Sequence, residues 1–172
     1  MEIETDSLLF DLIAADNFDD FCRCLIPEKL RTRSPRNNFT PFLYASYLGR
    51  VKFLRMLYYK GVGIHLSGFK NMKAVHFAAL RDNYEALKFL GDASFDLTET
   101  CDEKLNALHI ASREKAYKCA RFLMEKHPEM VNSKTEDGYV PLHFAIYNHD
   151  LLMVGMLLQS QADVYIKSDI HS

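Results

Sequence analysis

Histidine and cysteine are the residues of this chain with the most versatile chemistry, so their spacing is considered first. His76, His109 and His143 recur at nearly equal intervals, and each stands between two large apolar residues. A catalytic or metal-binding histidine usually has a second ligand or base at short spacing, and the chain has no H-E-x-x-H, no G-x-S-x-G and no glycine-rich phosphate loop. The regular spacing therefore indicates three equivalent positions in a scaffold, and we do not expect an enzyme.

The four cysteines, Cys22, Cys24, Cys101 and Cys119, do not form a metal or disulfide pattern. Cys22 and Cys24 are separated by one residue, which is tighter than the usual zinc-binding pair, and no second pair with matching spacing follows. A small secreted protein held by disulfides usually carries cysteines at higher density. We expect reduced thiols, no metal, no cofactor, and a location in the cytoplasm, the nucleus or both.

Length and charge set further limits on function. The chain has 172 residues, 48% of them apolar, and a formal net charge of -2. Bulk electrostatics therefore do not draw it to nucleic acid, and no apolar run approaches the roughly 20 residues that a membrane-spanning helix requires. The acidic start MEIETDSLLFDLI is unlike a secretory signal. We expect neither nucleic-acid binding, nor membrane insertion, nor a small-molecule substrate.

Four copies of one short motif recur at nearly constant spacing. The motifs are TPFLYAS, KAVHFAA, NALHIAS and VPLHFAI, which start at Thr40, Lys73, Asn106 and Val140. A second apolar segment follows each motif and holds a leucine at the same distance from the start of its motif in every copy. These leucines are Leu57, Leu90, Leu123 and Leu157. Two features that keep the same period four times indicate a repeat architecture.

Each unit is typical of a short helix, a turn, a second helix and an extended loop. Thr40 and Asn106 can cap the first helix of their units through a side-chain oxygen, whereas Lys73 and Val140 cannot. Gly49 can end such a helix in the left-handed conformation. A second helix is predicted over residues 51–59, because its apolar residues recur at helical spacing. One such unit cannot bury its own apolar faces, so we expect the units to stack.

The spacing of the motifs, together with the pattern T-P-L-H-x-A-A, resembles the ankyrin repeat, whose period is about 33 residues. The resemblance covers about residues 31–172 and is weaker in the middle, where Lys73 and Asn106 replace threonine, while Leu43 replaces histidine in the first repeat. It implies an all-α solenoid of stacked antiparallel helix pairs with β-hairpin finger loops, in which the histidines tie neighbouring loops together. The implied repeats are residues 35–67, 68–100, 101–134 and 135–167, followed by the start of a further finger.

The two ends of the array differ. Residues 1–30 carry apolar residues at helical spacing together with many acids, and we expect a divergent capping helix pair there. The other end shows no polar cap, so either the array is cut from a longer repeat protein or its last finger frays, and we favour the cut or closely truncated array.

The resemblance implies non-catalytic recognition of a partner protein through a concave groove. The module would serve as an adaptor or scaffold, or as the ankyrin domain of a larger protein, and would be a monomer on its own. Two alternatives stay open. One is a small standalone inhibitor that masks a signalling protein, similar to the inhibitors of NF-κB. The other is a targeting domain of a larger enzyme or channel.

Candidate partner-binding residues occupy positions that vary on the exposed surface of the family. The apolar residue before each motif either shields the junction of finger and helix or belongs to a stripe that anchors a partner. The candidate set comprises Phe39, Met72, Leu105 and Tyr139 before the motifs; Tyr47, Leu80, Arg81, Arg113, Tyr147 and Asn148 after them; and Arg36, Phe69, Lys70 and Glu136 in the fingers. Further finger residues expected at the same surface are Asn37, Asp102, Glu103 and Asp137.

Charge is unevenly distributed along the chain. Residues 31–66 contain seven basic residues and no acid, whereas residues 1–30 hold eight acids and two bases, and residues 131–172 hold five acids and two bases. A groove that changes from basic at the first finger to acidic at the last would orient a partner of opposite polarity. The alternative is that the basic block only neutralises the acidic segment before it.

Overall fold

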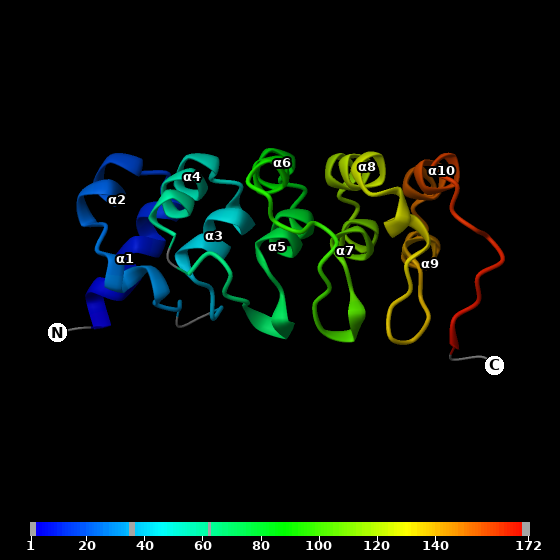
Figure 1. Cartoon of the computed structure of the whole chain (residues 1–172), viewed down its shortest axis with the longest axis horizontal. Coiled ribbons are helices and arrows are strands. Elements are labelled where there is room, and N and C mark those ends of the chain that lie inside the picture. Colours follow the sequence, from blue (N-terminus) through cyan, green and yellow to red (C-terminus); the bar gives the residue numbers. More distant parts are fainter. Residues whose placement is uncertain (1–2, 35–36, 62, 170–172) are drawn as a thin grey trace.

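The computed structural model describes residues 3–34, 37–61 and 63–169. Within these ranges ten α-helices form five antiparallel pairs that stand side by side in one row (Figure 1). The helices are α1 (Ile3–Ala14), α2 (Phe18–Cys24), α3 (Pro41–Leu48), α4 (Val51–Lys60), α5 (Ala74–Leu80), α6 (Tyr84–Asp92), α7 (Ala107–Arg113), α8 (Tyr117–Lys126), α9 (Pro141–Tyr147) and α10 (Leu151–Gln159). The all-α solenoid predicted from the repeat is confirmed.

The row has three levels in Figure 1. The outer helices α4, α6, α8 and α10 lie along the top, the inner helices α3, α5, α7 and α9 lie below them, and the fingers hang at the bottom. The inner helices pack successively on one another. Short 3-10 turns complete the connections: η1 (Pro27–Arg31), η2 (Phe69–Asn71), η3 (Asp102–Lys104) and η4 (Pro128–Asn132).

Helix starts and ends follow the local chemistry of the sequence. Thr40 Oγ1 accepts a hydrogen bond from the Leu43 amide at 3.3 Å, as a capping threonine should. Asn106 Oδ1 accepts from two amides of α7, each at 3.0 Å. Lys73 and Val140 provide no such side-chain cap. Gly49, with a φ of 69°, ends α3 in the left-handed conformation.

The fingers are tight turns and not regular hairpins. Among the residues described, the fingers contain no β-ladder, and the one bridge recorded joins Thr100 to Asn106. The Cys101 amide donates to the Leu105 carbonyl at 2.8 Å and closes the third finger. Glu103 at its tip has a φ of 63°. With so few residues in each arm, the chain turns back before a second pair of ladder bonds forms, so the predicted β-hairpin form is not seen.

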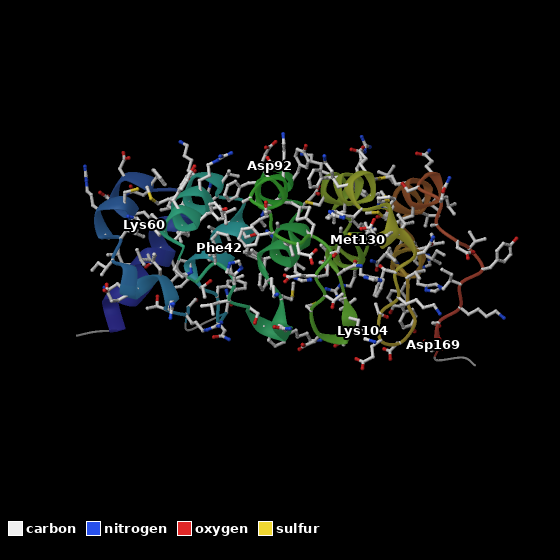
Figure 2. All side chains as sticks on the ribbon, viewed as in Figure 1. Phe42, Lys60, Asp92, Lys104, Met130 and Asp169 are labelled. Carbon is white, nitrogen blue, oxygen red and sulfur yellow. The ribbon has the colours of Figure 1, made fainter. Side chains whose placement is uncertain are left out.

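The core runs continuously through the stack. Phe53, Leu54 and Leu57 of α4 are fully buried, as their helical spacing predicts. Phe42 lies in the interior (Figure 2) and stacks on Phe95 of the next repeat, with ring centroids 5.6 Å apart. Burial is therefore shared between neighbours, and each pair needs the next for its core.

The first helix pair joins this core through aromatic side chains. The ring of Phe21 in α2 meets the ring of Phe53 edge-on, with centroids 4.9 Å apart. Arg50 forms an ion pair with Asp16 at 3.0 Å across the same boundary. In the described part of the chain, no helix has both the length and the apolar character needed to cross a bilayer.

Candidate functional site

The recurring histidines are joints between repeats. Nδ1 of His76 accepts a hydrogen bond from the Lys73 amide at 3.0 Å, and Nε2 lies 3.0 Å from the Glu99 carbonyl oxygen. Because an amide can only donate, Nδ1 is unprotonated and Nε2 carries the hydrogen that it donates to the carbonyl. The same pair of bonds joins His109 to Asn106 and Ser133 at 3.2 and 2.9 Å, and His143 to Val140 and Ile166 at 3.1 Å each.

This arrangement leaves the rings unavailable for proton transfer or metal binding. Both nitrogens are occupied by backbone groups, and burial lowers the pKa of His76 and of His109 to about 4. Burial also raises the pKa of the Cys119 thiol well above its usual range, so that thiol is unreactive. Across residues 3–34, 37–61 and 63–169, no group of three or more histidine, cysteine, aspartate or glutamate residues lies close enough together to hold a metal ion.

A depression lies between the first three fingers and the helices α3, α5 and α7. Its volume is about 680 Å³. We call it the finger groove. It is lined by Asn37, Asn38, Phe39, Tyr47, Phe69, Lys70, Met72, Phe77, Leu80, Cys101, Leu105, Ile110 and Arg113.

The apolar residues that precede the motifs form the floor of the finger groove. Phe39, Met72 and Leu105 are only 7%, 8% and 8% exposed, so the expectation that they project outward is wrong. The Phe39 ring packs against Tyr47 and Phe77, with centroids 5.4 and 4.7 Å away. These contacts agree with the shielding interpretation. The floor is therefore apolar and fixed by packing.

Tyr139 occupies the same position in the fourth repeat and behaves differently. It is half-buried, with its ring 5.7 Å from His143 and 6.0 Å from Phe144, centroid to centroid. It does not line the finger groove, which ends at the third finger.

The exposed part of the finger groove comes from the finger tips and the ends of the inner helices. Phe69 at the second fingertip is 65% exposed. Tyr47 and Leu80 are half-buried, and the Arg81 guanidinium lies over the Tyr47 ring, 5.2 Å from its centroid. Lys70 forms an ion pair with Glu103 at 2.9 Å and links the second finger to the third.

The other candidate residues lie at different places. Arg113 lines the groove and pairs with Glu114 at 2.8 Å. Tyr147 is 84% exposed beyond the groove, and Asn148 donates from Nδ2 to the Arg113 carbonyl at 2.6 Å, a bond between repeats. Glu136 is exposed on the fourth finger. Arg36 lies outside the described residues.

Four residues that line the finger groove are absent from the candidates: Asn38, Phe77, Cys101 and Ile110. Phe77 and Ile110 stand directly after the motif histidine, where helical periodicity assigns them to the core. They are indeed buried, and only a small part of each side chain borders the groove. Asn38 is left-handed, with a φ of 55°, and the Asn-Asn pair before Phe39 is a turn signal that would have pointed to it.

Charge changes along the fingers in the expected direction, although part of the basic block serves the fold. Arg50 is engaged with Asp16, as the neutralising alternative requires. Arg33 donates to the carbonyls of Asn38 and Ser67, each at 2.9 Å, and so holds two fingers together. The charged fingertip residues are Lys70 on the second finger, Asp102, Glu103 and Lys104 on the third, and Glu136 and Asp137 on the fourth. Lys104 is labelled at the lower edge of the row in Figure 2.

Comparison with known proteins agrees with this architecture. A family model described as ankyrin repeats (3 copies) matches residues 60–131 and again residues 75–168. Inversin from Mus musculus is 23% identical over 138 residues, which are 80% of this chain and 13% of that protein. Inversin from Homo sapiens is 22% identical over 138 residues. The tyrosine-protein kinase Shark from Drosophila melanogaster is 32% identical over 89 residues, 52% of this chain and 10% of that protein.

This chain thus spans only a small share of the relatives that it matches. The family model covers more than half of the chain, and its match falls on the helix pairs and histidine joints described above. The chain belongs to the ankyrin-repeat family.

Proposed function

We propose that this chain is a non-catalytic recognition module that binds an extended segment of a partner protein in the finger groove, as an adaptor or scaffold does. Ankyrin repeats are generally protein–protein interaction modules. The observation that carries the proposal is the exposed Phe69 ring beside a depression of about 680 Å³ with an apolar floor. An exposed aromatic residue next to such a depression is typical of a site where a partner anchors.

The fixed floor favours binding by a preformed surface. Phe39, Met72 and Leu105 are already packed, so a partner does not have to order them. An apolar side chain of the partner would contact Phe69, Tyr47 and Leu80, which retain exposed surface in the free chain. Removing that surface from water supplies the favourable free energy.

The charges beside the groove favour one orientation of the partner. Arg81 places positive charge beside the groove, whereas the charges of Lys70 and Arg113 are shared with Glu103 and Glu114. Acidic residues predominate on the fourth finger, at Glu136 and Asp137. A partner with acidic residues near the first two fingers and basic residues near the fourth would associate faster and in a single register.

The test is a paired capture experiment with a matched control. The groove variant carries Phe69→Ser, Lys70→Glu and Arg81→Glu. The control carries Tyr59→Ser, Lys52→Glu and Lys88→Glu on the exposed outer helices, so it makes closely similar chemical changes on another face. Both variants are first checked by circular dichroism for wild-type helix content.

A protein retained by the wild type and the control, but lost by the groove variant, supports the proposal. Hydrogen exchange of the complex should then show slowed amides in residues 69–72 and 101–105. Equal capture by all three chains, or protection confined to the outer helices, would move recognition away from the groove.

We also propose that the chain works in a reducing compartment, the cytoplasm or the nucleus. The support is chemical. Cys22, Cys24, Cys101 and Cys119 are all free thiols, and the last two are buried, Cys101 in the third finger and Cys119 in α8. Labelling of the denatured chain with a thiol reagent, directly after cells are lysed in that reagent and again after reduction, tests whether these thiols are reduced in the cell.

A further inference from the structure

A second, smaller depression lies between the outer helices α6 and α8, in the top level of Figure 1. Its volume is about 340 Å³, and we call it the outer depression. None of the residues that line it lines the finger groove. Aromatic and basic side chains meet in it, a combination that is enriched at protein interfaces. The lining residues are Tyr84, Tyr117, Lys118, Arg121, Phe122 and Glu125.

The aromatic walls of the outer depression are held in place by contacts within the chain. The Tyr84 ring meets the Phe122 ring edge-on, with centroids 5.6 Å apart. The Tyr117 hydroxyl donates to Asp150 Oδ2 of the next repeat at 3.0 Å. All three rings are half-buried, so each keeps surface that water reaches. A side chain that enters can therefore remove this surface from water without first ordering the walls.

The boundary between α4 and α6 shows what closes such a depression elsewhere in the row. Phe89 occupies the position in α6 that Phe122 occupies in α8, but it is only 8% exposed. The Arg55 guanidinium lies over the Phe89 ring, 5.0 Å from its centroid. The Tyr58 ring packs edge-on against it, 5.9 Å away. Two large side chains of α4 thus cover this phenylalanine.

Both covering residues are replaced at the boundary between α6 and α8. Lys88 stands at the position of Arg55, and Gly91 stands at the position of Tyr58. Lysine lacks the planar guanidinium that stacks on a ring. A Cβ placed on Gly91 would lie 3.8 Å from Cζ of Phe122, so a side chain at this position would contact the ring that glycine leaves open. These two replacements explain why Phe122 retains an accessible surface.

The positive charge around the outer depression is not neutralised within the chain. The helices α4, α6 and α8 carry seven basic and three acidic residues, a net charge of +4, whereas the whole chain carries -2. Among the ion pairs of the described residues, none involves a residue of these three helices. Lys118 and Arg121, about one helical turn apart on α8, are therefore available to carboxylates from outside.

We propose that the outer depression is a second binding site, which takes an acidic segment of a protein. An aromatic side chain of that segment enters among the three rings, and the neighbouring carboxylates pair with Lys118 and Arg121. Glu125 lines the far end of the depression, about 10 Å along α8 from Lys118, and repels carboxylates there. The acids of the segment therefore stand on one side of its aromatic residue.

A protein segment fits this surface better than a nucleic acid or an anionic membrane does. Glu85, Asp92 and Glu125 are exposed among the cations of the three helices. A phosphate backbone or an anionic bilayer presents negative charge throughout and would meet these carboxylates as well. A peptide can place its acids only where the cations lie. This site is separate from the finger groove, and the proposal does not depend on the function proposed for that groove.

Binding of a defined peptide tests the proposal. The probe is a short fluorescein-labelled peptide in which Glu-Asp-Glu precedes a single Phe. Fluorescence anisotropy follows its binding to the full chain at about 0.15 M salt, where exposed charges are screened beyond about 8 Å. This salt concentration suppresses attraction that does not depend on close contact.

Two charge-reversal variants are compared. The site variant carries Lys118→Glu and Arg121→Glu. Both side chains are exposed, and Lys118 lies in the first turn of α8, where an acid is favourable, so we expect wild-type helix content by circular dichroism. The matched control carries Lys104→Glu and Lys167→Glu, at two exposed residues outside the helices, and has the same net charge as the site variant.

The wild type, the control and the groove variant of the capture experiment should bind the peptide equally. The site variant should bind it at least about tenfold more weakly, because two attractive charges become repulsive. Replacing the Phe of the peptide by Ala should weaken binding to the wild type by about tenfold, since the aromatic side chain no longer fills the depression. Binding that survives in the groove variant separates this site from the finger groove.

Four results would overturn the proposal. The first is a wild-type chain that does not bind the peptide, and the second is a site variant that binds no more weakly than the control. The third is an affinity that does not change when Phe is replaced by Ala, or that is lost in the groove variant. The fourth is tighter binding of phosphatidylserine vesicles or of a single-stranded RNA than of the peptide, which would assign the surface to a polyanion.

Discussion

Acid should unfold this protein through its buried histidine joints. His76 and His109 are neutral in the folded chain, and burial lowers the pKa of each from 6.5 to about 4. In the unfolded chain both rings return to ordinary values and take up protons below pH 6.5. The unfolded state therefore binds more protons than the folded state between pH 6.5 and pH 4, so the free energy of unfolding falls as the pH is lowered through this window.

The size of the effect follows from the two pKa values. At pH 5 the unfolded histidine is largely protonated while the folded one is largely neutral, which corresponds to about 2 kcal/mol for each ring. For the two rings together the loss between pH 7 and pH 5 is about 4 kcal/mol, a large part of the roughly 5–15 kcal/mol that stabilises a domain. Asp96 does not contribute here, since hydrogen bonds from Thr98 lower its pKa below 3.8.

Urea unfolding followed by circular dichroism at pH 7, 6 and 5 measures this loss. His109→Gln supplies the control, because its side-chain amide cannot titrate. We expect the variant to be less stable at pH 7, since glutamine does not reproduce both hydrogen bonds of the His109 ring. Its free energy of unfolding should show about half of the wild-type dependence on pH. NMR titration of the ring carbons gives the folded pKa values directly.

Two results would refute this reasoning. One is a free energy of unfolding that stays constant between pH 7 and pH 5. The other is a His109→Gln chain whose pH dependence is as steep as that of the wild type, which would place the responsible groups elsewhere.

Two further predictions concern packing and the bonds between repeats. Leu108→Ala removes a fully buried side chain from α7 and should lower the free energy of unfolding by about 2–5 kcal/mol. Urea titration measures this loss. A loss below about 1 kcal/mol would mean that the neighbouring helices close around the cavity. Asn83 donates from Nδ2 to the carbonyls of Ser46 and Tyr47, at 3.1 and 2.7 Å, and so satisfies the end of α3 from the next repeat. Asn83→Ala should cost about 1–3 kcal/mol and speed hydrogen exchange near that end of α3, while exchange in α9 stays unchanged.

The repeat period predicted most of the fold because each unit carries its own helix signals. Thr40 and Asn106 cap, Gly49 ends α3, and Phe53, Leu54 and Leu57 are buried, all as the spacing indicates. These features depend on residues within one turn or one helix, which a sequence displays directly.

The groove was harder to predict because exposure depends on the neighbouring repeat. Phe39 precedes a motif and looks like a surface residue in its own unit, but Phe77 of the next repeat covers it. The fingertips depend on left-handed residues other than glycine, such as Lys70 and Glu103, which carry no clear signal. The apolar segment of α10 has the composition of a buried helix, and only the assembled row reveals its exposed leucines.

The histidine joints have a consequence for how fast the chain folds. Each joint links a repeat only to the next finger, and its two partners are 23 or 24 positions apart in sequence. The widest span among the hydrogen bonds described, from Cys119 to Ala78, is 41 residues. No large loop therefore has to close before favourable contacts form, and low contact order of this kind is associated with folding in microseconds to milliseconds. Folding of the 172-residue chain can thus start from any neighbouring pair of helix units and spread from there along the row.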